Sequence, residues 1–125
     1  MPTYFSSAEL SCHCCGAHPM DPAFLQRLTA LRVALGQPMR LSSAYRCPPH
    51  NGAVSATGPT GPHTTGRAVD VLVSGAAALE LVEQALAYGF TGIGVSQKGP
   101  HARRFVHLDD LPTAPGQPRP TIWSY

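Results

Sequence analysis

One aspartate in an otherwise apolar run most constrains how this 125-residue chain can fold. Asp70 lies in the segment "GRAVDVLVS", whose valines favour a short strand. Alternate residues of a strand share a face, so Asp70 points the same way as Ala68 and Leu72. A carboxylate on a buried apolar face is costly unless it is paired or bound to a metal. The fold must therefore bring a partner to Asp70.

Histidines supply candidate partners. His63 lies seven residues before Asp70, and Gly66 lets the chain turn between them. In "RFVHLDD", strand alternation places His107 and Asp109 on one face. Two histidines and a carboxylate match a catalytic zinc site with one position open for water, whose pKa zinc lowers from ~15.7 toward ~7. The alternative is a His63–Asp70 hydrogen bond and an unrelated buried His107.

Two helices are expected from hydrophobic spacing. The first begins after Asp21, a favourable N-cap followed by proline, and ends at Gly36. Its apolar face carries leucines at helical spacing: Leu25, Leu28, Leu31 and Leu35. The second helix spans residues 75–90 and ends near Gly89. Its expected apolar stripe is Leu79, Val82 and Leu86.

Four short segments are expected to be strands: residues 39–46, 66–74, 91–96 and 104–109. The last two read as a hairpin, and residues 47–63 as one short helix or a long loop. This order predicts an α+β fold with a central antiparallel sheet and flanking helices. We expect one domain over residues 1–125, with segments 1–20 and 111–125 packed on it.

The proline-rich tail is expected to be extended and to dock through Ile122, Trp123 and Tyr125. Glycine and proline make up 12 and 13 residues, which agrees with a fold rich in turns.

Charge and hydropathy exclude several classes of partner. The formal charge is +2 without a long basic run, so nothing favours a nucleic-acid partner. No apolar run approaches the roughly 20 residues of a membrane helix, so we expect no membrane insertion. Residues 1–10 lack the basic start and apolar core of a signal peptide. We expect a monomer made in the cytoplasm that reaches an extracellular target by lysis or another export route.

Several motifs occur in an order that resembles a known family. They are "FSSAELSCHCCG", "SSAYRCPPHN", "HTTGRAVDV", "GFTGIGVS" and "RFVHLDD". The chain is similar, from about Phe5 to Trp123, to the zinc D-alanyl-D-alanine carboxypeptidase family. That family includes phage endolysins and bacterial endopeptidases that cut peptidoglycan peptides, and its fold is related to hedgehog-type zinc peptidases. The chain looks most like its small single-domain members, which phages and prophages often encode.

The resemblance implies that His63, Asp70 and His107 bind one catalytic zinc ion. It also implies that Arg46, in the "YR" motif, lines the site and grips a substrate carboxylate or a developing oxyanion. The alternative for Arg46 is a surface or salt-bridge arginine. The implied function is zinc-dependent hydrolysis of peptidoglycan stem or cross-link peptides. The competing hypothesis is a non-catalytic zinc-containing module that binds cell wall or serves as a phage structural part.

The chain departs from the family at two positions. Many members carry an acidic general base three residues before the last histidine ligand, where this chain has Arg104. We predict Asp109 as the replacement base, although it could equally be a turn or capping aspartate. Gly61 stands where many members have serine. His101 could reach the site or be an exposed loop histidine, and selectivity is expected in loops 53–62 and 96–103.

Four cysteines leave three alternatives open. Cys12, Cys15, Cys47 and His50 have the CxxC…CxxH form of a structural metal site, and Cys14 lies within the first cluster. One disulfide to Cys47 is the second alternative. The third is four reduced thiols, which a cytoplasmic origin favours. Either link would hold the N-terminal segment close to the arginine that precedes Cys47.

Overall fold

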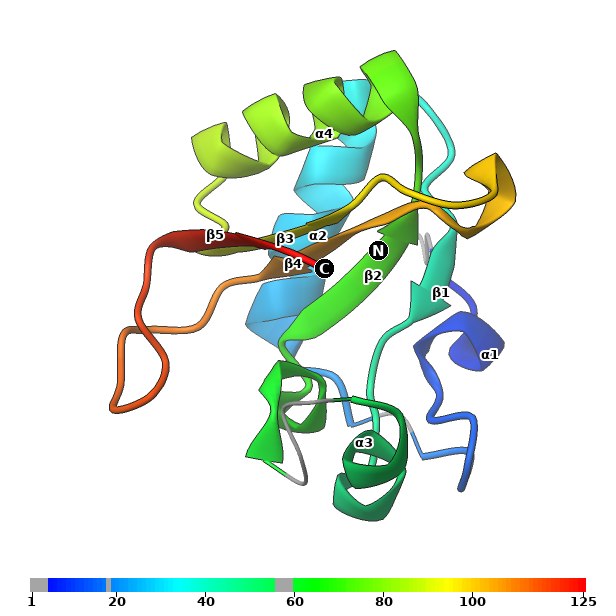
Figure 1. The fold of residues 1–125 in the computed structure, drawn as a ribbon, viewed down its shortest axis with the longest axis vertical. Helices are drawn as coiled ribbons and strands as arrows, with labels where there is room; N and C mark the ends of the chain where they lie inside the picture. The colour runs from blue at the N-terminus through cyan, green and yellow to red at the C-terminus, as the bar shows by residue number, and fades with distance from the viewer. Residues whose placement is uncertain (1–4, 18, 56–59) are drawn as a thin grey trace.

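A single five-stranded sheet organises the protein, in the strand order β1-β2-β4-β3-β5 (Figure 1). The computed structural model describes residues 5–17, 19–55 and 60–125. The strands are β1 (Leu41–Ser43), β2 (Ala68–Leu72), β3 (Gly92–Ser96), β4 (Phe105–Asp109) and β5 (Thr121–Ser124). Neighbours pair antiparallel except β3 and β5, which run parallel. The predicted α+β fold and the β3–β4 hairpin are confirmed.

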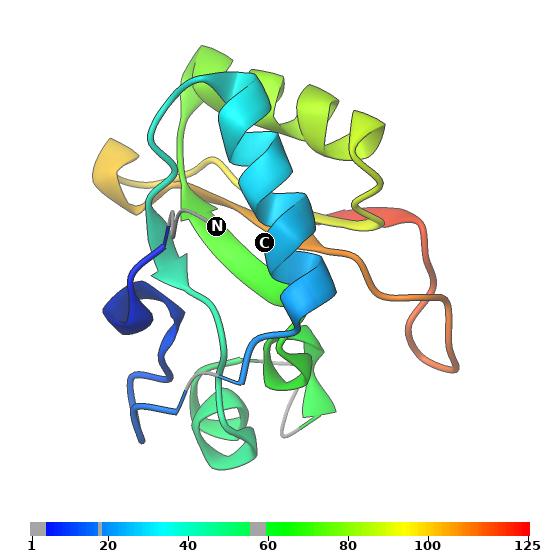
Figure 2. The same cartoon turned by 180° about the vertical axis from the view of Figure 1, so that it is seen from behind.

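Helix α2 (Pro22–Leu35) lies behind the sheet in Figure 1 and in front of it in Figure 2, and α4 (Gly75–Ala87) runs across the top of both views. The Asp21 carboxylate accepts a hydrogen bond from the Phe24 N–H at 2.9 Å and so caps α2. Gly36 ends the helix with a left-handed φ of 65°. Two short helices, α1 (Ser7–Leu10) and α3 (Pro48–Val54), lie toward the β1 side and the lower end of the sheet in Figure 1.

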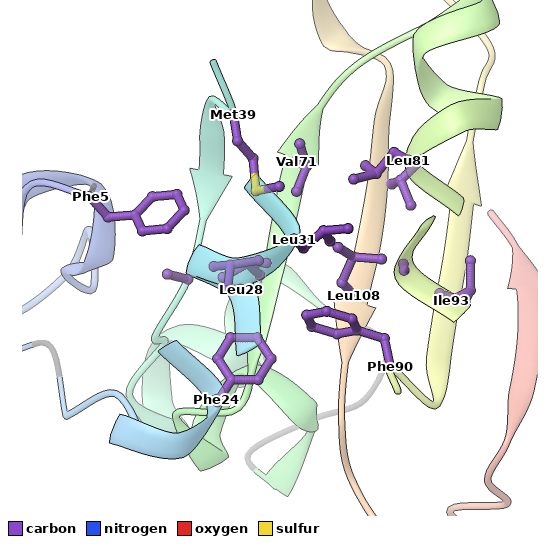
Figure 3. Close-up of a cluster of buried hydrophobic side chains, with 14 of the residues drawn as sticks. Phe5, Phe24, Leu28, Leu31, Met39, Val71, Leu81, Phe90, Ile93 and Leu108 are labelled. Carbon is purple, nitrogen blue, oxygen red and sulfur yellow. The ribbon is translucent and has the colours of Figure 1, made fainter. Parts of the chain in front are cut away.

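The hydrophobic core fills the space between the sheet and the helices α2 and α4 (Figure 3). Phe24 of α2 meets Phe90 edge to face, with ring centroids 5.8 Å apart. The sheet contributes buried residues of one face: Val69, Val71, Ile93, Val106 and Leu108. Full burial of such side chains stabilises a fold by about 1.5–3 kcal/mol each. The opposite face of the sheet is therefore left for polar groups.

The predicted apolar stripe of α4 is wrong at two of its three named residues, whereas Val82 is partly buried and packs against the core. Leu79 and Leu86 are 72% and 57% exposed, while Ala78, Leu81 and Ala85 are buried. The buried stripe is displaced from the predicted one by one residue, about 100° around the helix. The inward face consists partly of small alanine side chains, which the spacing of the larger apolar residues does not reveal.

The first predicted strand, residues 39–46, is also too long. Only Leu41–Ser43 forms β1, whose register against β2 is irregular. Beyond it the chain leaves the sheet and pairs with the 3₁₀ turn Pro62–Thr65: the Arg46 N–H donates to the His63 carbonyl at 3.1 Å. This departure places Arg46 beside the open face.

The tail is extended only at its end, as β5 at the edge of the sheet, because residues 114–117 form a tight turn before it. Ile122 is 65% exposed, so its predicted docking role is wrong. The Tyr125 ring instead packs against Phe105, with centroids 5.0 Å apart. The loop 53–62 includes residues 56–59, which lie outside the described residues. None of the helices in the described ranges is long and apolar enough to cross a membrane.

Candidate metal centre

One row of residues crosses the open face of the sheet. The strand register places Ser43, Asp70, His107, Gly94 and Trp123 side by side on β1, β2, β4, β3 and β5. Because strand residues alternate between faces, this row lies on the side opposite to the buried valines. Asp70 and His107, distant in sequence, become cross-strand neighbours here.

His63 reaches the same place from outside the sheet. It lies in the 3₁₀ turn Pro62–Thr65, and Gly66 follows with a φ of 75°. A side chain at Gly66 would also collide with the Pro19 carbonyl. Glycine is therefore required for the tight turn from His63 into β2.

Three ligand atoms converge at this point. His63 Nε2 lies 3.2 Å from Asp70 Oδ1, His107 Nδ1 lies 3.1 Å from the same oxygen, and the two nitrogens are 3.3 Å apart. All three side chains are buried. Ligands of a tetrahedral zinc ion at bonds of about 2.0–2.1 Å would lie about 3.3–3.4 Å apart. The triangle is therefore close to the size of one face of a zinc coordination shell.

The outer nitrogen of each imidazole is held by an acceptor. His63 Nδ1 lies 2.6 Å from the Ala44 carbonyl oxygen, and His107 Nε2 lies 2.8 Å from Asp109 Oδ2. With the proton on the outer nitrogen of each ring, both inner nitrogens would present lone pairs beside Asp70 Oδ1. Three acceptors would then face one point, which favours a cation between them. The donor set fits a zinc ion.

Both oxygens of Asp70 are engaged. Oδ2 accepts a hydrogen bond from Arg46 Nη2 at 3.2 Å. Arg46 is itself anchored, because its Nε donates to Ser43 Oγ at 3.0 Å and its Nη1 to Asn51 Oδ1 at 3.2 Å. Burial raises the pKa of Asp70. Hydrogen bonds from His107 and His63 lower this pKa by more than burial raises it, so the net shift is downward. Asp70 is therefore held as a carboxylate.

Asp109 lies on the other side of the His107 ring. Its side chain is fully buried and accepts two hydrogen bonds from Arg119, at 2.9 Å from Nε and 2.8 Å from Nη2. Burial raises the pKa of Asp109, but His107 and Arg119 lower it to a net downward shift. Burial lowers the pKa of His107, while Asp109 and Asp70 raise it to a net upward shift. The result is a chain of contacts from Arg119 through Asp109 to His107.

Two glycines of β3 make room for this arrangement. A Cβ at Gly92 would collide with the Asp109 carboxylate, and one at Gly94 would lie 2.6 Å from Trp123 Nε1. The Trp123 ring packs against His107 at 5.0 Å between centroids and under the Arg119 guanidinium at 5.3 Å. The "GIG" motif therefore leaves space on the open face for the groups that surround His107.

The ligand triangle opens into a cavity of about 860 Å³. Three groups of side chains line it beside the ligands: basic Arg46, Arg103, His13 and His50, aromatic Phe105, Trp123 and Tyr125, and aliphatic Val54, Pro62 and Leu72. Among the described lining residues, Asp70 is the one carboxylate. The cavity is large enough for a small peptide segment.

The structure brings together some predicted site residues but not others. His63, Asp70, His107 and Arg46 meet, whereas Asp109 is near them without lining the cavity. Its role as general base stays a prediction. Arg104 turns away, with its Nε donating to the Gly99 carbonyl at 3.1 Å. His101 is exposed on a 3₁₀ turn and does not line the cavity.

Sequence reasoning misses two contributors, Arg119 and Trp123. For Trp123 the sequence indicates only a role in docking the tail, and it singles out no role for Arg119. Two glycines at alternate positions of β3 could have indicated that large side chains cover this face. Arg119 carries no comparable signal, because it lies in an irregular proline-rich segment.

The cysteines form a second cluster, and all four are free thiols. Sulfur atoms of Cys12, Cys15 and Cys47 lie within 4.8 Å of one another. Burial raises the pKa of the Cys12 thiol, but hydrogen bonds from the backbone N–H groups of Cys47, Cys14 and Cys15 lower it to about 6. The ligand atom of His50 does not join this group.

Comparison with known proteins adds an independent line of evidence. A family model described as Peptidase M15 matches residues 3–109, which include the three residues of the triangle. The matched range ends before Arg119 and Trp123. No curated protein matches the chain. Because the family model spans most of the sequence, the chain belongs to the peptidase M15 family.

Proposed function

We propose that this protein is a zinc-dependent peptidase that hydrolyses peptidoglycan stem or cross-link peptides. The observation that carries the proposal is the triangle of His63, Asp70 and His107 at a cavity of about 860 Å³. Membership of the peptidase M15 family, whose members are zinc-dependent, supports the identity of the metal.

The three ligands would hold the ion through His63 Nε2, Asp70 Oδ1 and His107 Nδ1. A bound zinc ion supplies Lewis acidity, which polarises a carbonyl and makes water a better nucleophile at neutral pH. The protein orients the ligands through the Ala44 carbonyl and the Asp109 carboxylate. This support would keep the ligands in place without reorganisation during turnover.

Arg46 is proposed to contribute positive charge near the substrate. It lines the cavity, and its contacts with Ser43, Asn51 and Asp70 leave little freedom for its side chain to move. A fixed guanidinium can stabilise a substrate carboxylate or negative charge that develops on a carbonyl oxygen. Its own contact with Asp70 also helps to hold that ligand.

The lining of the cavity suits an anionic peptide with short aliphatic side chains. Arg46 and Arg103 bring positive charge, and Asp70 is the one acid among the described lining residues. The aromatic wall that includes Trp123 and Tyr125 can pack against small apolar groups. Both a carboxypeptidase and an endopeptidase substrate of the cell wall share these properties.

We propose a positioning role for Asp109 in place of its predicted role as general base. Both of its oxygens are bound by Arg119, and Oδ2 also contacts His107 Nε2. It is fully buried and absent from the cavity lining. A carboxylate in this place fixes the tautomer and orientation of a metal-binding imidazole.

The test is mass analysis of fragments released from purified muropeptides. We expect hydrolysis that stops with a chelator and returns with zinc. Asp70→Ala should abolish hydrolysis and zinc binding at the triangle, while Glu80→Ala, at an exposed carboxylate on α4, should change neither. Hydrolysis that survives complete removal of metal would overturn the proposal.

A second candidate is a non-catalytic zinc module that binds the cell wall. It is favoured by Arg104 at the usual acidic position and by the lack of a further carboxylate among the described lining residues. Stoichiometric zinc and binding to muropeptides without any released fragment would support this candidate.

A further inference from the structure

A second group of metal-ligating side chains lies apart from the triangle, where the N-terminal segment meets the loop after β1. It consists of Cys12, Cys15 and Cys47, whose sulfur atoms all lie within 4.8 Å of one another. Cys12 and Cys47 are 35 residues apart in sequence, yet their sulfurs are 3.6 Å apart. We propose that these three cysteines bind a structural zinc ion that fixes the N-terminal segment to this loop.

The distance between the sulfurs agrees with coordination. Two thiolates on one tetrahedral zinc ion, with bonds of about 2.3 Å, lie about 3.8 Å apart. A disulfide would need about 2.05 Å and would use only two of the three sulfurs. The sulfur of Cys15 lies close to the other two. A metal site needs such a third ligand, whereas a disulfide does not.

The backbone around the cysteines supports the same conclusion. The Cys47 N–H donates to Cys12 Sγ at 3.3 Å, and the N–H groups of Cys14 and Cys15 also point to that sulfur. The Cys47 sulfur accepts from the N–H of His50. Both sulfurs are thus held by backbone N–H groups. Such hydrogen bonds orient metal-binding thiolates and stabilise their charge.

A tight turn holds the first part of the cluster in place. The Cys12 N–H donates to the Ala17 carbonyl at 2.7 Å, and the Gly16 N–H donates to the Cys12 carbonyl at 2.8 Å. Cys12 itself is buried, whereas Cys15 is exposed. The cluster therefore sits at the surface with one side accessible to an incoming ion.

The fourth ligand would come from a neighbour of the cluster. Cys14 directly precedes Cys15, and His50 lies three residues after Cys47. Either side chain can complete a tetrahedral shell, made of four thiolates in the first case and of three thiolates and one imidazole in the second. The Cys14→Ser and His50→Ala variants distinguish them, because only the true ligand weakens binding of the second ion.

The consequence concerns Arg46, which directly precedes Cys47. Its guanidinium holds Asp70 of the triangle at 3.2 Å. An ion at the cysteine cluster would fix the backbone at Cys47, directly after Arg46. This part of the chain lies beyond the end of β1, so the sheet does not hold it. Such an ion would be structural, and it would help to hold Arg46 in contact with Asp70.

The experiment measures metal content of protein purified under reducing conditions and loaded with zinc. Native mass spectrometry should give two zinc ions per chain in the wild type. His63→Ala should retain one ion, held by the cysteines, and the Cys12→Ser/Cys47→Ser double variant should retain the other. Each variant removes a different zinc ion. The experiment can therefore refute the cysteine site without refuting the proposed peptidase site, and the reverse.

Cobalt substitution tests the proposal in folded wild-type protein, in case the cysteine variant does not fold. Thiolate-to-cobalt charge transfer should appear in the near ultraviolet and persist in His63→Ala, since the triangle contains no sulfur. The proposal would be overturned if the wild type bound only one zinc ion per chain and the cobalt-substituted protein lacked this absorption. A denatured mass two hydrogens lower than that of the reduced chain, which indicates a disulfide, would also overturn it.

Discussion

Asp109 contacts His107 on the side of the imidazole opposite to the ligand triangle, with 2.8 Å between Oδ2 and Nε2. Strand alternation explains the pair: residues 107 and 109 are two apart on β4 and share one face. The contact extends to Arg119, so a residue beyond the sheet supports a proposed metal ligand within it.

Asp109→Asn separates the two roles considered for this residue. As a positioning residue, Asp109 fixes the His107 tautomer, so zinc affinity should fall about 10- to 100-fold together with turnover. Competition with a chromophoric chelator measures the affinity. Asp110→Asn is the matched control, because Asp110 is also a buried, paired aspartate but binds Arg67. A variant that binds zinc normally yet loses turnover would restore Asp109 as the general base.

Arg119→Met should destabilise the protein by about 3 kcal/mol, because it leaves the buried Asp109 carboxylate without its paired charge. Urea unfolding of the zinc-free protein checks this value. Arg103→Met, at an exposed arginine, should change the free energy of unfolding by less than about 0.5 kcal/mol. Equal effects of the two substitutions would refute the proposed support of Asp109.

Gly94→Ala should displace Trp123, since the new methyl group would lie 2.6 Å from the indole nitrogen. We expect lower stability and lower turnover with zinc still bound. Trp123→Ala removes the obstacle, so the Gly94→Ala/Trp123→Ala double variant should be more stable than the sum of the single effects predicts. Thermal unfolding of all four proteins forms the cycle, and additive effects would contradict the contact.

Asp21 should make stability depend on acidity. The Phe24 N–H, the charge of Arg67 and other contacts lower the pKa of Asp21 in the folded protein. Its contribution is therefore complete above the ordinary pKa of about 4 and is lost as pH falls through the lower folded value. Asp21→Asn keeps a capping side chain without the charge. Its unfolding free energy should fall less than that of the wild type between about pH 6 and pH 2, and identical profiles would exclude this contribution.

Much of the site could be predicted because β-strand alternation is strict. An aspartate in an apolar run, and the alternation around His107, both point to one polar face. The turn at Gly66 brings in His63. By contrast, Arg119 reaches Asp109 from a segment without periodicity, so its contact depends on how the tail folds back.

The helices show a different limit. The first long helix is predictable because capping residues and large leucines mark it. In α4 the inward face is partly alanine, which a search for large apolar residues overlooks. The early end of β1 depends on contacts with the turn around His63, which lies 19 residues away from Ala44.

Anomalous diffraction at the zinc absorption edge, on crystals of the zinc-loaded protein, tests the central claim most directly. We predict a strong peak bonded to His63 Nε2, Asp70 Oδ1 and His107 Nδ1, at about 2.0–2.2 Å from each. Zinc-saturated crystals with no peak among these three atoms would contradict the account.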